Sequence, residues 1–580
     1  MIGLCAGIVK LNNPIISIIS MSNNSDIETA SNYHEATKHS YTSVRTNPHS
    51  LDFENQPLPF KIYPQLELLR MPSEVRQTGI AAVSAISGSS PTQTDAVPDL
   101  ATIAQLLYLS AGITRQRKYS GGEIYFRAAA CTGALYEIEL YLVCGDLPQL
   151  PAGIYHFAPA EFGLRRLRAG DYSAVLLEAT GGNPAIAQAP MTIVCTGIYW
   201  RNAWKYQART YRHFGWDNGT LLANLLAVAT AMGYPAKIAC GFVDASLNRL
   251  LDLDTDHEVA FSMVAVGHHS GSLSQTISQT TSQTTPESTE FSPLGLETVP
   301  LSANEVDYPL MDEMHDGSSL GSFAEVAAWR RAADPDRAEP GSSAMTQRGA
   351  PASVPPTGLM IPLQPLSDAE IPRDPIEQVI LRRGSSRQFA RMPITFAQLS
   401  TMLDRATRGV SADFLASRGT DADGDQLATP QLSGTQLHGD QLNDLYLIVH
   451  AVDGLEAGAY FYRRDAGALE CLKRGDFRDQ AGYLGLEQQL PADAAVDIFF
   501  LAELRPIFSR FGNRGYRAVQ LEAGVIGGRL YLAAYSQRLG ATGLTFYDDD
   551  VTRFFSPHAE GKSAIFLVAV GHSVKRRPGQ

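Results

Sequence analysis

One short segment of the chain carries groups suited to holding a phosphate. Arg383, Ser385 and Arg387 lie in the sequence Arg382-Arg-Gly-Ser-Ser-Arg387, directly after the apolar helical stretch Ile376–Leu381. Two guanidinium groups and a hydroxyl in one short turn can clamp a phosphate, because arginine donates to phosphate through two N–H groups and stays charged. The same pattern also fits a solvated helix end, so its interpretation depends on the surrounding elements.

Other short patterns do not predict a metal site or a nucleophile. His34 and His39 are five residues apart, so they would not share one helical face as zinc-binding histidines do. The segment Gly317-Ser-Ser-Leu-Gly321 has the spacing of a nucleophile elbow, but no buried strand precedes it. The six cysteines form no CxxC pair and are expected to be free thiols.

The phosphate-binding pattern lies in the second of two repeated segments. Glu139–Val143 matches Asp444–Ile448, and Arg209–Arg212 matches Arg514–Arg517. Both pairs, and two more between them, keep the same offset of 305 residues without a gap. Chance matches would not keep one offset, so we infer that one domain fold occurs twice.

Two polar stretches divide the chain. Residues 270–289 are rich in Ser, Thr and Gln, and residues 333–357 are rich in Pro, Gly and polar side chains. Neither stretch has the apolar residues that a core needs. Between them we expect one helix within 306–329, packed on a domain. The predicted units are a disordered extension (1–20), an N-terminal arm (21–75), a first domain (76–270), a largely disordered linker (271–372) and a second domain (373–580).

The apolar patterns predict an α+β fold with helices around a mixed sheet. Continuous apolar runs indicate buried strands, and apolar residues at helical spacing indicate core helices. The predicted strands are 140–143, 261–266, 445–449 and 564–570, and the predicted helices are 100–110, 221–232, 396–407 and 523–539.

The repeated segments resemble the nitroreductase family, in which an RxSxR motif near the start of the domain binds the phosphate of flavin mononucleotide (FMN). The first copy resembles one branch in particular, the SagB-type dehydrogenases and azoline oxidases. The residues that carry this likeness are Tyr33–Ser40, Leu51–Pro57, Phe60–Tyr63 and Arg127–Tyr136. The resemblance implies two fused nitroreductase-like domains that form an intramolecular pseudo-dimer.

The family's flavin lies at a dimer interface, where one subunit binds the phosphate and the other supplies a loop near the flavin. Cys131, Thr132 and Gly133 occupy that loop here, with Ala130 and Cys131 in place of the usual Pro and Ser. A plain turn before a strand, which needs Gly133, is the alternative interpretation.

Two glycine turns resemble the family's loop near flavin N5, namely Cys240–Phe242 and Thr542–Leu544. Gly543 and Leu544 are the better candidates for cofactor binding, because they belong to the same copy as the phosphate-binding pattern. The alternative is an ordinary strand turn.

The two copies lack different parts of the family's site. The first copy has no RxSxR motif, and its predicted counterpart is Val75–Ile80. The second copy lacks the loop, and the offset leads instead to Leu432–His438. If the halves pack as the family's dimer does, the remaining parts meet once. We therefore expect one flavin per chain.

Lys205 and Tyr206 resemble a Lys-Tyr pair that is implicated in proton abstraction in azoline oxidases. The offset positions hold Arg510 and Phe511, which cannot do this work, because arginine stays protonated and phenylalanine has no hydroxyl. A lysine base needs a lowered pKa, which burial or a nearby cation supplies. The alternative is a surface lysine beside a core tyrosine.

The resemblance implies an FMN-dependent oxidoreductase of the SagB-type dehydrogenase kind, acting on a small molecule or on an azoline in a modified peptide. An NAD(P)H-dependent nitro or quinone reductase is the alternative enzyme; the chain has no Rossmann fingerprint, so a nicotinamide would bind only transiently. A flavin-free scaffold in a biosynthetic complex is the alternative of another class.

The net charge and the apolar content of the chain limit the kinds of partner that we expect. A net charge of −13 disfavours nucleic acid and anionic membranes. The apolar residues 1–20 are interrupted by polar ones and too few to span a bilayer. We expect a cytoplasmic monomer, because the fused halves already satisfy the family's interface.

Overall fold

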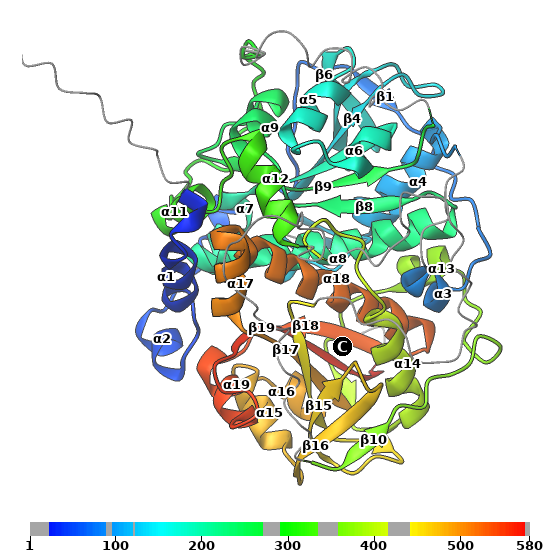
Figure 1. Ribbon diagram of the computed structural model, residues 1–580, viewed down its shortest axis with the longest axis vertical. Coiled ribbons are helices and arrows are strands. Elements are labelled where there is room, and N and C mark those ends of the chain that lie inside the picture. Colours follow the sequence, from blue (N-terminus) through cyan, green and yellow to red (C-terminus); the bar gives the residue numbers. More distant parts are fainter. Residues whose placement is uncertain are drawn as a thin grey trace, which may run out of the picture.

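The computed structural model describes residues 23–88, 95–119, 122–270, 291–333, 358–415 and 441–574. The predicted extension at residues 1–20 lies outside these ranges. In Figure 1 the sheets of the two copies lie toward opposite ends of the molecule, and the long helices α8 (Thr210–Ala231) and α18 (Gly515–Ser536) run between them. No helix in these ranges combines the length and hydropathy that crossing a membrane requires.

Each copy builds one large antiparallel sheet. The strand orders are β1-β6-β5-β4-β7-β9-β8 in the first copy and β10-β16-β15-β13-β17-β19-β11 in the second, where β18 also pairs with β19. The α+β class is confirmed, but the expected mixed sheet is wrong, because every recorded pair within these two sheets is antiparallel. Apolar runs do not reveal strand direction when both faces of a sheet are covered.

The strands of the first sheet are β1 (Leu68–Arg70), β4 (Ile138–Cys144), β5 (Gly153–Ala158), β6 (Gly163–Ala169), β7 (Met191–Ile198), β8 (Ala236–Ala239) and β9 (Glu258–Val266). Those of the second are β10 (Met360–Pro362), β11 (Phe389–Ala390), β13 (Asp444–Val449), β15 (Gly458–Arg463), β16 (Ala468–Arg474), β17 (Val496–Ala502), β18 (Gly540–Leu544) and β19 (Ser563–Ser573). Two small ribbons pair β2 (Ile113–Tyr119) with β3 (Gly122–Arg127), and β12 (Ile394–Thr395) with β14 (Val452–Asp453).

The repeat in the sequence is a repeat in the structure. The helix α7 (Tyr199–Tyr206) corresponds to α17 (Leu504–Phe511), and both lead through a short 3-10 turn into α8 or α18 at the same offset of 305 residues. The remaining helices of the first copy are α3 (Ala82–Ser87), α4 (Leu100–Ala111), α5 (Ser173–Ala179), α6 (Pro184–Gln188) and α9 (Asp244–Leu251). Those of the second are α13 (Ile376–Arg382), α14 (Phe396–Ala406), α15 (Arg478–Leu484), α16 (Gln489–Asp493) and α19 (Asp548–Phe555).

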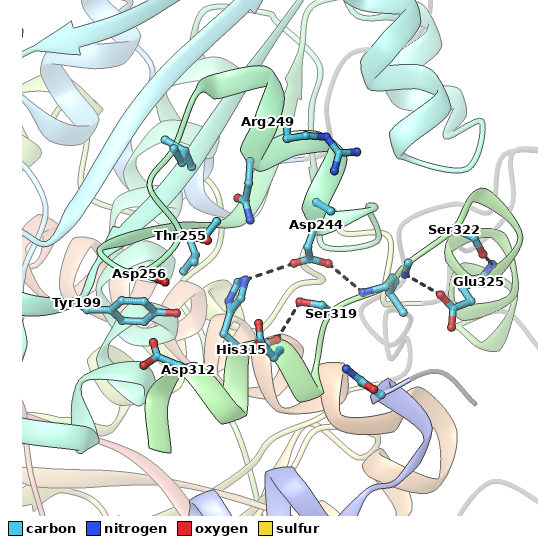
Figure 2. A pocket seen from close by; sticks show the side chains of 18 residues that line it. Tyr199, Asp244, Arg249, Thr255, Asp256, Asp312, His315, Ser319, Ser322 and Glu325 are labelled. Carbon is cyan, nitrogen blue, oxygen red and sulfur yellow. Dashed lines mark hydrogen bonds and ion pairs between the residues drawn. The ribbon is translucent and has the colours of Figure 1, made fainter. Parts of the chain in front are cut away.

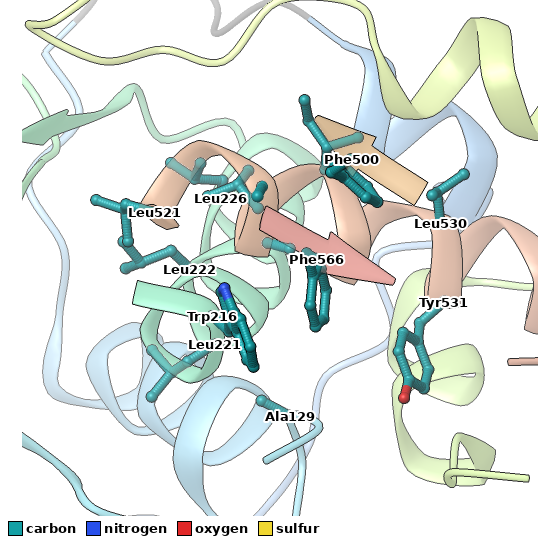
Figure 3. Packing of buried hydrophobic residues seen from close by; sticks show 14 of the residues in the cluster. Ala129, Trp216, Leu221, Leu222, Leu226, Phe500, Leu521, Leu530, Tyr531 and Phe566 are labelled. Carbon is teal, nitrogen blue, oxygen red and sulfur yellow. The ribbon is translucent and has the colours of Figure 1, made fainter. Parts of the chain in front are cut away.

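The seam between the halves is built on close packing of α8 against α18. A Cβ added to Gly219 would lie 2.5 Å from the Cα of Gly524, so only glycine allows the two backbones to come this close. Figure 3 shows leucines of both helices in the same buried cluster, among them Leu222, Leu226 and Leu521. Trp216 donates to Gln520 across the seam at 2.6 Å. The two domains therefore form the predicted intramolecular pseudo-dimer.

Two helical arms extend the domains. The first contains α1 (Glu28–Ala36) and α2 (Tyr41–Thr46), which lies beside α19 of the second copy (Figure 1). The other contains α11 (Pro309–Gly317) and α12 (Phe323–Ala332), inside the stretch predicted as linker. In that stretch, residues 271–290 and 334–357 are not among the described ones.

A buried cluster of arginine and aspartate ties the first arm and the first copy to the second copy. Asp548, at the start of α19, accepts from Nη1 of Arg212 at 2.7 Å and from Nη1 of Arg209 at 3.2 Å. Arg212 also donates to the Oγ1 of Thr37 and to the backbone carbonyl of His34 in the arm. Three parts of the chain are thus joined by one carboxylate.

A second cluster repeats this arrangement in the opposite direction. Asp244, at the start of α9, accepts from Arg514 and Arg517 of the second copy at 2.7 Å each. Arg517 also donates to Ser318 and to the carbonyl of His315, both in the second arm. Burial alone would raise the pKa of Asp244, but the two guanidinium groups lower it to about 2.

Replacing Asp244 by Asn should destabilise the protein by about 3–5 kcal/mol, because two buried guanidinium groups lose their counter-charge. Glu456→Gln removes one side of the exposed ion pair with Arg474, so as a control it should change stability by less than about 1 kcal/mol. Denaturant unfolding followed by circular dichroism measures both. Equal effects of the two variants would show that the cluster contributes no more than a surface pair.

The same cluster predicts a direction for acid sensitivity. The folded-state pKa of Asp244 lies below the unfolded-state value of about 3.9. Its contribution to stability is therefore complete above that value and is lost as the pH falls toward about 2. Unfolding midpoints measured between pH 6 and pH 2.5 should fall less steeply for Asp244→Asn than for the unchanged chain.

Candidate active site

The predicted phosphate-binding segment and the predicted loop meet at the seam. Arg383, which follows α13, donates from Nε to the carbonyl of Ala128 at 2.9 Å and from Nη2 to that of Arg127 at 3.2 Å. These two carbonyls belong to the segment of the first copy that leads into the turn at Cys131. The candidate site at the seam thus combines segments of both copies that are far apart in the chain.

Cationic side chains of the two copies meet across the seam as two pairs, Lys205 with Arg387 and Arg115 with Arg383. Lys205 and Arg115 come from the first copy, and Arg383 and Arg387 from the second. Their mutual influence is visible in two lowered pKa values: that of Lys205, through burial and Arg387, and that of Arg383, through burial and, to a smaller extent, Arg115. Within the described ranges no carboxylate forms an ion pair with any of the four. Such a set of donors fits an anion such as a phosphate.

Tyr531 of α18 connects the predicted cofactor-binding elements of the second copy. Its hydroxyl accepts from the backbone N–H of Gly543 at 2.5 Å and lies 3.4 Å from the Oγ of Ser385. Burial raises the pKa of Tyr531, so it stays protonated. Gly543 and Leu544 are both half-buried at the end of β18. The two predicted cofactor-binding elements of the second copy are therefore joined through one tyrosine that the sequence did not single out.

The turn at Cys131 is held by an aspartate that the sequence reasoning missed. Asp217 of α8 accepts from the backbone N–H of Thr132 at 2.8 and 2.9 Å and from its Oγ1 at 2.9 Å. The Sγ of Cys131 lies 3.3 Å from Asp217 and 3.4 Å from Glu137. Burial, with Glu137 nearby, raises the pKa of Asp217, which favours its protonated form.

Cys131 is not an activated nucleophile in this setting. Burial and the two neighbouring acids raise the pKa of its thiol well above the ordinary value. Ligand atoms of Cys131, Glu137 and Asp217 lie within 4.8 Å of one another, as a metal site would require. The hydrogen bonds among these groups account for the cluster without an ion. The turn therefore has a positioning role, and Gly133 supplies the left-handed backbone (φ 64°) that it needs.

Lys205 and Tyr206 lie at the end of α7, near the turn at Gly133 and near Arg387. The Nζ of Lys205 is 5.3 Å from the centre of the Tyr206 ring. A Cβ added to Gly133 would be 2.9 Å from the Tyr206 hydroxyl, so this phenol reaches the turn. Burial raises the pKa of Tyr206, and burial with Arg387 lowers that of Lys205. The pair thus combines a phenol that keeps its proton with an amine that gives its proton up more readily.

The corresponding place on the other side of the pseudo-dimer is covered by the chain itself. The carboxylate of Asp413 accepts from the backbone N–H groups of Cys240 and Gly241 at 2.8 and 3.0 Å. A Cβ on Gly241 would lie 2.9 Å from the Trp329 ring, which therefore packs directly on this turn. The glycine turn of the first copy is thus occupied by residues from elsewhere in the chain.

One predicted counterpart is wrong. The helices α3 and α13 are equivalents by their place in the chain, because α3 comes before α4 as α13 comes before α14. The counterpart of the phosphate-binding segment is therefore expected after Ser87, not at Val75–Ile80, which precedes α3 and donates from Thr78 to Glu377 of α13. The sequence after Gly88, Ser89-Ser-Pro-Thr-Gln-Thr94, has no arginine either; it lies outside the described residues, as does the loop counterpart Leu432–His438.

Comparison with known proteins identifies the family of both copies. The model of the nitroreductase family matches residues 94–268 and 380–572, which together are more than half of the chain. The chain therefore belongs to the nitroreductase family and contains two of its domains, and it is an oxidoreductase by this membership.

Three relatives illustrate the range of the likeness. The structure of a putative nitroreductase from Anabaena variabilis is similar with a TM-score of 0.68 and 25% identity, over 94% of this chain and 99% of that one. The putative nitroreductase MJ1384 of Methanocaldococcus jannaschii is 26% identical over 177 residues, 30% of this chain and 81% of the relative. The microcin B17-processing protein McbC of Escherichia coli is 25% identical over 127 residues, 21% of this chain and 47% of McbC, about half of its length.

Proposed function

We propose that the chain is an FMN-dependent oxidoreductase with one cofactor site, at the seam. Arg383, Ser385 and Arg387 would hold the phosphate, and the turn Cys131–Gly133 and the segment Gly543–Leu544 would line the flavin ring. The observation that carries the proposal is that cations of the two halves meet across the seam, Lys205 with Arg387 and Arg115 with Arg383, without an acidic ion-pair partner among the described residues. When bound, FMN supplies hydride transfer at its ring.

The expectation of one flavin per chain has separate support. On the opposite side of the pseudo-dimer, Asp413 uses the backbone N–H groups of the equivalent glycine turn, and Trp329 covers it. The lysine of the seam site is there replaced by Arg510, which donates to the carbonyls of Ala332 and Ala333. The glycine turn on the opposite side thus contacts the second arm.

The substrate that we favour is a thiazoline or oxazoline in a modified peptide. Two observations support it: the likeness to azoline oxidases around Lys205-Tyr206, and the similarity to a relative whose name describes microcin B17 processing. In this reaction Lys205 takes a proton from the ring carbon, since its lowered pKa favours the neutral amine. Tyr206 keeps its proton and orients the substrate by donating a hydrogen bond.

An NAD(P)H-dependent nitro or quinone reductase is the second candidate function. The similarity to two putative nitroreductases supports it. Anaerobic addition of NADPH distinguishes the candidates, because rapid bleaching of the flavin absorbance is expected of the reductase and not of the azoline oxidase. A colourless protein that cannot be reconstituted with FMN would instead support the flavin-free scaffold.

The cofactor proposal predicts a stoichiometry of one. Flavin absorbance and phosphate content of the purified protein should give one FMN per chain, and a ratio of two would contradict the proposal. Arg387→Ala should weaken FMN binding by roughly 10- to 100-fold, the scale expected for a hydrogen bond to a charged group. The control is Arg391→Ala, four residues further on, whose exposed side chain pairs with Asp493 and which should leave binding unchanged.

The proton-transfer proposal predicts separate effects on binding and turnover. Lys205→Ala should lower turnover of an azoline peptide by roughly 10²- to 10⁴-fold while the flavin content stays the same. Lys205→Arg should not restore turnover, because arginine keeps its proton. The exposed Lys118→Ala is the control. The rate of the unchanged chain should rise with pH through a midpoint below the ordinary lysine pKa, and an unaltered rate in Lys205→Ala would rule out the role.

A further inference from the structure

A pocket that contains none of the residues proposed for the seam site lies between α9 and α11. Its volume is about 910 Å³, and Figure 2 shows the side chains that surround it. Carboxylates dominate its wall: Asp256, Asp312, Asp316 and Glu325 line it together with one cation, Arg249. The pocket is therefore acidic and large enough for part of an organic molecule.

Asp244, which also lines the pocket, is paired with Arg514 and Arg517, whereas the pocket's other carboxylates have no ion-pair partner among the described residues. Burial and the neighbouring acids, Asp307 and Asp316 first among them, raise the pKa of Asp312 to about 6. Burial also raises the pKa of Asp316. Within the described residues, neither of these carboxylates, nor that of Asp256, forms an ion pair. A cation placed among them would relieve this repulsion.

The other half of the molecule contains such a cation at the equivalent place. The arms correspond through their contacts: Arg517 binds His315 and Ser318 as Arg212 binds His34 and Thr37. This correspondence pairs Asp316 with Glu35 and Ser319 with Lys38. In the first arm the ammonium of Lys38 lies 2.6 Å from Glu35 and 2.9 Å from Asp549. In the pocket, the residue at the lysine's position is a serine.

A buried hydrogen-bond donor also faces the pocket. His315 is 4% exposed, and its Nε2 has no hydrogen-bond partner in the described part of the chain. Its Nδ1 lies 3.2 Å from a guanidinium nitrogen of Arg517, which can only donate, so the ring proton belongs on Nε2. Figure 2 shows the ring between Tyr199 and Asp244, whose nearest oxygen is 3.8 Å from Nε2. An acceptor on a ligand would satisfy this N–H group.

The spacing of the acids argues against an inorganic ion. Across the described ranges, the group of possible metal ligands with all atoms within 4.8 Å of one another is Cys131, Glu137 and Asp217. None of these three residues lines this pocket. The pocket's carboxylates are spread more widely. A cation on a longer carbon chain suits them better.

We propose that this pocket binds a lysine side chain of a peptide, with the ammonium group between Asp312 and Asp316 and a peptide carbonyl accepting from His315. Of the two acids that hold Lys38, Glu35 corresponds to Asp316; the counterpart of Asp549 is Ala245, and in the pocket Asp312 supplies the second carboxylate instead. This binding does not depend on the cofactor proposed for the seam.

The test uses the full chain and two blocked tripeptides, acetyl-Gly-Lys-Gly-amide and its norleucine analogue, in isothermal titration calorimetry. The lysine peptide should bind at least tenfold more tightly, with an affinity that falls as salt is raised. Ser319→Lys should supply an internal ammonium, as in the first arm, and so reduce peptide binding at least tenfold. The control is Ser509→Lys, which adds the same charge on the exposed side of α17.

Several results would overturn the proposal: equal binding of the two peptides, unchanged binding in Ser319→Lys, or binding of Mg²⁺ with no binding of the lysine peptide. If Ser319→Lys does not fold, Asp316→Asn should weaken the lysine peptide selectively and serves instead. Flavin content is measured in every variant. A colourless protein that cannot be reconstituted with FMN but binds the lysine peptide would contradict the cofactor proposal and leave this one standing.

Discussion

The structure depends on two buried carboxylates that each bind a pair of arginines from the other half. Asp548 holds Arg209 and Arg212, and Asp244 holds Arg514 and Arg517. Buried charges are costly unless they are paired, so the halves are penalised in any arrangement that separates these groups. The clusters therefore specify how α8 lies against α18. That arrangement in turn sets Arg383 on the carbonyls of the first copy, where the candidate site forms.

Fusion of the two copies allowed the two sides of the pseudo-dimer to diverge. In a homodimer each substitution appears at both sites, whereas here each copy can lose the part that the other supplies. The seam keeps cations of both copies, Lys205 and Arg387 among them, without an acidic ion-pair partner in the described ranges. On the opposite side Asp413 and Trp329 use the equivalent turn for packing. The two sides of the pseudo-dimer therefore differ in the groups that surround their glycine turns.

The sequence predicted what local pattern and repetition encode. The offset of 305 residues located equivalent elements, and the apolar periods located the long helices, although α8 and α18 begin before the predicted stretches. Contacts between distant segments were not predictable. They include the direction of the strands, the hydrogen bonds of Asp413 to the turn of the first copy, and those of Asp217 and Tyr531 to the predicted site residues. For the second arm, one helix was predicted within 306–329, where the structure has two, α11 and α12; that α11 corresponds to α1 was not predictable, because it follows from their contacts with Arg517 and Arg212.

The two arms share the contacts that hold them but differ in one residue away from the seam. Both arms keep the groups that bind the arginines, since Thr37 and Ser318 each supply a hydroxyl oxygen and His34 and His315 each supply a carbonyl. What differs is the residue facing outward, where a lysine stands in one arm and a serine in the other. The fold therefore tolerates both, because the buried cluster, and not the outer ion pair, holds the arm. An acid pocket without its internal cation is then compatible with a stable structure, and its unpaired carboxylates are available to a ligand.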